Sequence, residues 1–426
     1  MRVLVYPHSM ELGGSQLNAV ELAAAVRDRG HEVTLLGEPG SLVDVVRRLG
    51  LDYVPRDPRA RRRPSPRAMA QLTSLAAERR IDVVHGYEWP PAVEAFFGPR
   101  LRRGVPAVCT VMSMSVAPFL PRGMPLVVGT ADIRRRAQAA GHADVTLLEP
   151  PVDVRANAPA FDPGPFRARY CLAPDIPLVA VVCRLVPELK LEGLLAACAA
   201  VGRLAVSGVD VQLAVVGDGP ARPQVASAAS AANAAAGRRV VVLTGELTDP
   251  RPAYASADVL LGMGGSALRG MAFGVPLVVQ GERGFWRLLT PESASAFLDQ
   301  GWYGIGSDVD SATGVDRLAA ALAGLLADPA ARERLGAYGR QLVVERFSLD
   351  RAAAVQEEVY AAALAAAPGW ATAAVAADAA RSAAGVTRHQ LRRKWQRLRG
   401  SVATDDFNAA ALPHGTARSP DPQGAR

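Results

Sequence analysis

The chain has 426 residues and a formal net charge of +7, and half of its residues are hydrophobic. Because so long a chain exceeds one compact core, we expect two α/β domains of about 150–200 residues each. The four cysteines, Cys109, Cys171, Cys183 and Cys198, form no CxxC pair, which excludes a cysteine metal site and predicts reduced thiols. No apolar run is long enough for a membrane span and MRVLVYP lacks a signal-peptide pattern, so we expect a cytoplasmic protein.

The first half of the chain alternates short apolar strands with helices. Strands are predicted at 3–6, 31–36 and 53–55, and helices at 16–29, 41–49 and 69–78. Gly13 and Gly14 precede the first helix, at the sheet edge where α/β proteins bind ligands. Their spacing is not GxGxxG, so a dinucleotide fingerprint is absent.

Two features of this half have open interpretations. The basic run RDPRARRRPSPR at 56–67 is either a contact for an anionic acceptor or membrane surface, or a solvated loop, as charge runs usually are. His85 stands where a strand meets its loop, which suits a substrate contact, although a lone histidine there is as often structural.

A Pro-rich stretch at 149–177 predicts the linker between a domain at 1–160 and a second domain at 161–367. The second domain again alternates: strands are predicted at 178–183, 211–216, 240–243, 259–261 and 277–279, and helices at 191–207, 222–236, 316–326, 330–345 and 349–367.

A glycine-rich turn at 262–266 separates two of these strands. Ser266 is a suitable N-cap for a helix over 267–273, after Gly264 and Gly265. Glycines that lead into a helix expose N–H groups that attract phosphate. The alternative is a tight turn without a ligand.

Residues 368–426 are rich in Ala, Arg, Ser and Pro, which predicts a largely disordered basic tail. Within it, 387–400 places Leu391, Trp395 and Leu398 on one helical face among six basic residues. That pattern is typical of a helix on an anionic membrane surface, and a solvated Arg-rich tail is the alternative. No nucleic-acid binding is expected, because nothing else in the chain supports it.

Several segments, in order, resemble those of one enzyme family. These are ELGGSQLNAVELAAAVRDRGHEV, DVVHG, RLVPELK, LAVVGDGP, VVLTGEL, MAFGVPLVV and ERFSLDRAAAVQEEVY. Over roughly residues 1–366 they resemble the retaining GT-B glycosyltransferases of the family-4 type (glycosyl transferases group 1). The resemblance implies two doubly wound Rossmann-like domains that face each other across a cleft, with the helix at 349–367 crossing back to the first domain.

The resemblance also implies the chemistry. A nucleotide-diphosphate sugar would bind the second domain, and the sugar would pass with retention to a cell-envelope glycan or natural-product acceptor on the first. No metal and no permanently bound cofactor would be needed, so basic side chains and helix N-termini must offset the charge on the departing diphosphate. The resemblance assigns this task to Arg184 and Lys190. It places at the donor site Gly13, Gly14, Gly245, Glu246, Gly264, Gly265, Ser266 and Arg269.

The sequence departs from the family pattern at the donor site. Two Glu residues eight positions apart are usual there, but this chain has Leu261 and Arg269, so the acid that would hold the ribose is missing. Arg269 would contact phosphate instead, or face solvent. Lys190 lies one residue later than usual, and Met112 stands where a His is common. These departures leave open a catalytically silent nucleotide-sugar-binding or scaffold protein, or a nucleotide-sugar epimerase, whereas the retained Arg184 and Lys190 favour the transferase.

Overall fold

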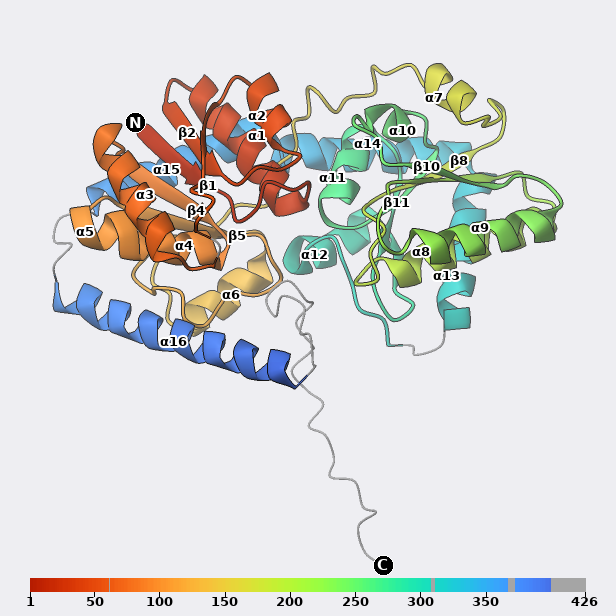
Figure 1. The fold of residues 1–426 in the computed structure, drawn as a ribbon. Helices are drawn as coiled ribbons and strands as arrows, with labels where there is room; N and C mark the ends of the chain where they lie inside the picture. The colour runs from red at the N-terminus through yellow and green to blue at the C-terminus, as the bar shows by residue number, and fades with distance from the viewer. Residues whose placement is uncertain (61, 308–310, 367–371, 400–426) are drawn as a thin grey trace, which may run out of the picture.

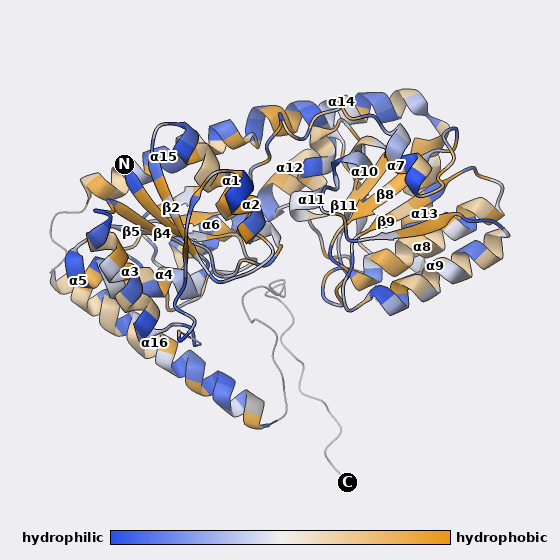
Figure 2. Cartoon of the chain, turned by 45° about the horizontal axis from the view of Figure 1, so that its top comes forward, coloured by the Kyte–Doolittle hydropathy of each residue, from blue (hydrophilic) through white to orange (hydrophobic). Residues whose placement is uncertain are grey.

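The computed structural model describes residues 1–60, 62–307, 311–366 and 372–399. The chain forms two α/β domains, each with a parallel-dominated sheet between layers of helices (Figure 1). Figure 2 shows the strands of both sheets as the most hydrophobic part of the chain, as expected where helices cover both faces of a sheet. The predicted fold of two doubly wound sheets is confirmed.

The N-terminal sheet has seven parallel strands. In spatial order they are β3 (Asp52–Pro55), β2 (Glu32–Gly37), β1 (Arg2–Tyr6), β4 (Val83–Tyr87), β5 (Ala107–Val111), β6 (Leu126–Val128) and β7 (Val145–Leu147). The associated helices are α1 (Gly14–Asp28), α2 (Val43–Arg48), α3 (Pro66–Glu78), α4 (Trp89–Ala95), the π-helical η1 (Phe96–Arg100), α5 (Leu101–Arg103) and α6 (Ala131–Ala139).

The C-terminal sheet has six strands, of which the last is antiparallel. In spatial order they are β10 (Val241–Gly245), β9 (Gln212–Val216), β8 (Leu178–Val182), β11 (Val259–Gly262), β12 (Leu277–Gln280) and β13 (Trp286–Leu288). The helices of this half are α7 (Gly164–Arg169), α8 (Leu191–Val206), α9 (Arg222–Ala236), α10 (Arg251–Ala255), α11 (Gly264–Ala272), α12 (Pro291–Gln300), α13 (Ser311–Ala327) and α14 (Pro329–Arg346).

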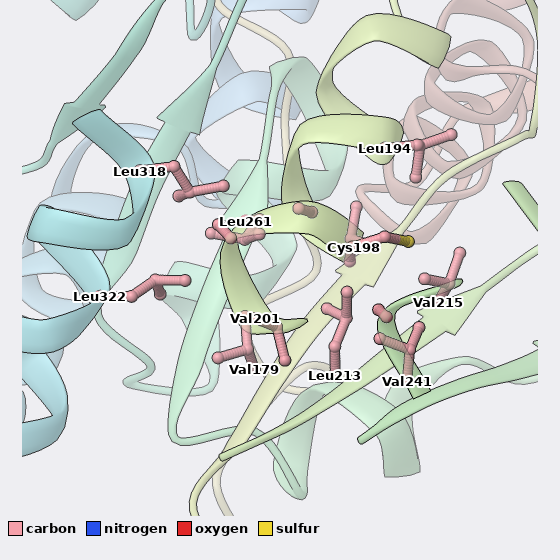
Figure 3. Packing of buried hydrophobic residues seen from close by; sticks show 14 of the residues in the cluster. Val179, Leu194, Cys198, Val201, Leu213, Val215, Val241, Leu261, Leu318 and Leu322 are labelled. Carbon is pink, nitrogen blue, oxygen red and sulfur yellow. The ribbon is translucent and has the colours of Figure 1, made fainter. Parts of the chain in front are cut away.

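The core of the C-terminal domain lies between this sheet and helices α8 and α13 (Figure 3). Strand residues such as Leu213 and Leu261 pack against Cys198 of α8 and Leu318 of α13, and all four are fully buried. All four cysteines are free thiols, with Cys171 exposed and Cys109 and Cys198 buried.

Helix α15 (Leu349–Ala365) returns to the N-terminal domain, where it packs on α1, β4 and β5. The chain passes between the two domains twice, near Val152 and near residues 347–349, and the two segments lie side by side. The Val152 N–H donates to the Phe347 carbonyl (2.8 Å), and the Leu349 N–H donates to the Val152 carbonyl (2.9 Å). This double connection fixes α15 in the core of a domain far from it in sequence.

The expectation of a disordered tail is wrong for residues 373–386, which form the first part of helix α16 (Ala373–Leu398) against the N-terminal domain (Figure 1), whereas the helix expected from residue 387 onward is its last part. Composition was misleading because small residues make part of the contact: a Cβ on Gly385 would lie 2.4 Å from the Cβ of Phe119, and the neighbouring Val386 is buried. Residues 400–426 lie outside the described part. Among the described residues, no helix combines the length and the apolar character that a membrane span requires.

Candidate functional site

Each sheet has one point where the strand order reverses, between β1 and β4 and between β8 and β11. In open α/β sheets, ligands bind beyond the carboxyl ends of the strands at such a point. Residues 183–190 follow β8 and residues 263–266 follow β11, so the segments predicted to bind the donor leave neighbouring strands of one sheet.

The loop after β8 is held by the loop after β9. The Leu185 N–H donates to the Asp218 carbonyl (2.8 Å), and the Ala221 N–H donates to the Leu185 carbonyl (2.9 Å). Gly217 makes this approach possible, because its φ is +137° and a Cβ there would lie 1.9 Å from the Cys183 oxygen. Its N–H donates to the carbonyl of Gly245 (2.9 Å), which brings the end of β10 into the same group of loops. Glu246 follows with an exposed side chain.

Arg184 and Lys190 are the two cations of the β8 loop. Arg184 is exposed and Lys190 is half-buried, and within the described residues no hydrogen bond or ion pair of either side chain to a carboxylate is found. Leu189 has a φ of +63°, so the extra residue of RLVPELK is accommodated in a left-handed conformation just before Lys190 caps α8. Burial lowers the pKa of Lys190, with the Cys183 thiol nearby. Two cations without a carboxylate partner are a suitable site for an anion.

The start of α11 corrects the sequence prediction. The helix begins at Gly264 with Met263 as its N-cap, so Ser266 is its third residue and its Oγ donates to the Met263 carbonyl (3.0 Å). Gly264 has a φ of +55°, and its N–H donates to the Trp302 carbonyl (2.8 Å). The N–H groups of Gly265 and Ser266 belong to the first turn, which has no acceptor within the helix, and they remain for an anion.

Arg269 reaches across to the other domain. Its Nη2 lies 3.2 and 3.4 Å from the two carboxylate oxygens of Glu21 on α1. The exposed fractions of the two side chains are 15% and 19%, so Arg269 does not face solvent. Burial raises the pKa of Glu21, and Arg269 opposes that effect. A Cβ on Gly265 would lie 3.4 Å from the Nη1 of Arg269, so this guanidinium also lies beside the first turn of α11.

The facing domain presents Gly13 as the N-cap of α1 and Gly14 as its first residue. A Cβ built on Gly14 would meet no atom within 4 Å, so the space beside its backbone is open. The structure therefore leaves room for the close approach that we expect of a ligand at this helix start.

Glu88 is a residue that sequence reasoning missed. It follows β4 at the reversal point, with a φ of +66° and an exposed fraction of 6%. Its carboxylate accepts hydrogen bonds from Ser15 Oγ (2.8 Å), the Met112 N–H (3.0 Å) and Ser113 Oγ. Glu88 thereby ties the start of α1 to two other loops of the N-terminal sheet edge. The one signal in the sequence was a carboxylate directly after an apolar strand.

The interpretation of His85 as a site residue is wrong. His85 is fully buried, with Nδ1 2.7 Å from the Tyr360 hydroxyl and Nε2 2.7 Å from Thr110 Oγ1. Both ring nitrogens are therefore engaged inside the domain, and burial lowers the pKa of His85 to about 3. The residue stabilises the packing of α15 on the sheet and reaches no ligand.

We expect His85 to make stability depend on acid pH. Because the pKa is about 6.5 in the unfolded chain and about 3 in the fold, the unfolded state binds the extra proton between these values, so its contribution is constant above pH 6.5 and falls below it. The loss is about 1.4 kcal/mol per pH unit. The free energy of unfolding, measured with denaturant at several values between pH 7 and pH 4.5, should depend less steeply on pH for His85→Gln than for the parent protein. Equal slopes would contradict the assignment.

Two arginines of the basic run at 56–67 are neither solvated nor open to a ligand. Arg56 donates to Glu38 (2.7 Å) and lies 3.6 Å from the buried Glu94, and Arg63 donates to the same oxygen of Glu38 (2.7 Å). Both interpretations of the run are therefore wrong for Arg56 and Arg63. Arg59, in contrast, is exposed and pairs with Asp57.

The described residues contain no cluster of three His, Cys, Asp or Glu side chains that could hold a metal ion. The basic side chains of residues 184–190 and the first turn of α11 are features of the C-terminal domain that suit an anion.

Solved structures of GT-B glycosyltransferases share this two-domain fold. A glycosyltransferase from Rickettsia africae has 14% identity and a TM-score of 0.66, covering 85% of this chain and 98% of that one. Anabaena HepE in complex with UDP and glucose has 15% identity and a TM-score of 0.63, with coverage of 85% and 99%. Sucrose-phosphate synthase from Thermosynechococcus elongatus has 17% identity and a TM-score of 0.64, with coverage of 86% and 100%. At these identities the structures establish the fold, and no curated protein matches the chain.

Family comparisons identify both domains. Residues 12–147 match Glycosyltransferase Family 4, and residues 176–328 match Glycosyl transferases group 1. The chain is therefore a glycosyltransferase with a family 4 domain followed by a group 1 domain.

Proposed function

We propose that the protein transfers a sugar from a nucleotide-diphosphate sugar to an acceptor with retention of the anomeric configuration. The supporting observation is that Arg184 and Lys190, two cations without carboxylate partners in the described structure, lie on the loop after β8, the neighbour of the strand that leads into α11. HepE was solved with UDP and glucose, and UDP-glucose is the ligand of another HepE structure, which makes UDP-glucose the first donor to test.

In the proposed reaction the bond between the anomeric carbon and the donor phosphate breaks, and a bond from that carbon to an acceptor oxygen forms. The nucleoside diphosphate leaves with the electron pair, and its departing phosphate oxygen takes up the proton that the acceptor hydroxyl gives up. Negative charge grows on the departing diphosphate. We assign its stabilisation to Arg184, Lys190 and the N–H groups of Gly265 and Ser266, because donors that the fold holds in advance need little reorganisation as the charge develops. Gly14 would admit the donor close to the backbone of the facing domain.

The ion pair between Arg269 and Glu21 joins α11 of the C-terminal domain to α1 of the N-terminal domain. We propose that Arg269 acts on the donor as well as on this contact between the domains. Arg269→Glu should weaken donor binding about tenfold or more, because it places a second carboxylate beside Glu21 and near the donor phosphates. Calorimetric titration with UDP-glucose measures this effect.

The double variant Glu21→Arg, Arg269→Glu separates the two roles of Arg269. It restores an ion pair between the domains but leaves a carboxylate on α11. Donor affinity should stay low if Arg269 acts on the donor, and it should return to the parent value if only the pair matters. Tighter binding by the single variant Arg269→Glu would contradict a donor contact.

A further inference from the structure

Helix α16 lies beyond the two matched domains, since the second match ends at residue 328. Its inner face is anchored to the N-terminal domain. The Asp378 carboxylate accepts from the Gly123 N–H (2.9 Å), and Arg381 Nη1 donates to the Pro118 carbonyl (2.9 Å). Further along, the His389 ring lies 5.5 Å from that of Trp89 and 5.3 Å from that of Phe119. These contacts hold the helix in place up to residue 389.

The outer face of the last turns of α16 is apolar and exposed. Leu391, Trp395 and Leu398 have exposed fractions of 54%, 61% and 75%. Their spacing of four and three residues puts them on one side of the helix. They are three of the six large hydrophobic side chains that are exposed within the described residues, so exposed apolar surface is concentrated here.

The same turns carry positive charge without any negative charge. No acidic residue occurs between Asp378 and Asp405 in the sequence. Exposed basic side chains flank the apolar stripe, namely Arg388, Arg392, Lys394 and Arg399. Figure 2 shows the C-terminal half of α16 as predominantly hydrophilic, interrupted by hydrophobic residues.

We propose that α16 docks the protein on the surface of an anionic lipid bilayer. A helix with an apolar stripe between cations lies in the plane of the membrane interface, where its apolar side chains enter the acyl boundary and its cations meet the headgroups. Trp395 is suited to that depth, because tryptophan is enriched at the interface between membrane and water. The long stems of the flanking Arg and Lys residues let their charges reach the headgroups while the helix stays shallow.

Other occupants fit this surface less well. A nucleic acid would pair with the cations but would leave Leu391 and Leu398 in water. A second copy of the chain would bury the apolar stripe but would bring two sets of cations together, which costs free energy. An anionic bilayer accommodates both the apolar stripe, in its acyl boundary, and the flanking cations, at its headgroups.

The test is sedimentation of the full-length protein with vesicles of phosphatidylcholine that contain about 30% phosphatidylglycerol, compared with pure phosphatidylcholine. The protein should sediment with the anionic vesicles only. Binding should weaken as salt rises, because salt screens the attraction between cations and headgroups. The triple variant Leu391→Ser, Trp395→Ser, Leu398→Ser should lose about tenfold or more of the vesicle binding. A second variant, Arg388→Gln, Lys394→Gln, Arg399→Gln, should lose a similar amount.

Val206→Ser is the matched control, because Val206 is 60% exposed on α8 of the other domain, and it should bind vesicles like the parent protein. All variants should melt at the parent temperature, since they change exposed side chains. Sedimentation of the apolar triple variant equal to that of the parent would overturn the proposal. So would parent protein that binds DNA or self-associates through this face without binding vesicles. The readout is independent of sugar transfer.

Discussion

Arg184→Ala should lower the rate constant of nucleoside diphosphate release by about 10²–10³-fold with the donor at saturation. Arg184 is exposed on the loop after β8, so its removal takes away a positive charge without opening a cavity in the core. Steady-state kinetics with UDP-glucose as the first donor, together with a thermal melt, measures both properties. The melting temperature should stay at the parent value.

Two further variants give this prediction its control. Arg184→Lys keeps the charge but loses the planar fork that matches a phosphate, so it should recover only part of the rate. Arg287→Ala removes another exposed arginine, on β13, and should leave the rate unchanged. An Arg184→Ala variant with the parent rate would contradict the assignment of the diphosphate site.

Gly217→Ala should destabilise the C-terminal domain by about 3 kcal/mol, and it should also reduce activity. The new Cβ would meet the Cys183 oxygen at 1.9 Å at a φ of +137°, so the loop that carries Arg184 must move. Denaturant unfolding and the rate of diphosphate release measure the two losses.

Gly237→Ala is the matched control, because its φ is also positive (+63°) but a Cβ there would meet no atom within 4 Å. It should cost only the backbone strain, about 1 kcal/mol, and leave the rate unchanged. If the two variants had equal stability, the close approach of the β8 and β9 loops would not be required for the fold.

Patterns local in sequence predicted most of the fold. Short apolar runs, such as those of β8 and β11, predicted the strands. Glycine-rich turns predicted the loops at the points where the strand order reverses. The start of α11 was placed wrongly because Ser266 is a good cap by type, whereas the helix begins three residues earlier than predicted, at the left-handed Gly264. The first part of helix α16 was missed because its Ala-rich composition is typical of a disordered tail, whereas the contacts that hold it, such as those of Val375 and Val386, are made with residues distant in sequence.

Pairs distant in sequence could not be predicted. The partner of Arg269 is 248 residues away, and the partners of Arg56 and Arg63 lie on other elements of the sheet edge. A run of arginines gives the number of charges but not the carboxylates that the fold brings to them. The role of His85 was open for the same reason, since Tyr360 comes from α15, 275 residues later.

The central claim is that Arg184 and the first turn of α11 belong to a donor site, and a measurement of donor binding tests this claim most directly. A thermal-shift series of the parent protein and Arg184→Ala against a panel of nucleotide-diphosphate sugars, with UDP-glucose first, measures it. We expect at least one donor to stabilise the parent protein, by about 2.7 kcal/mol at 100 times its dissociation constant, and to stabilise Arg184→Ala far less. No shift with any donor, or an equal shift in both proteins, would contradict a donor site at Arg184 and the first turn of α11.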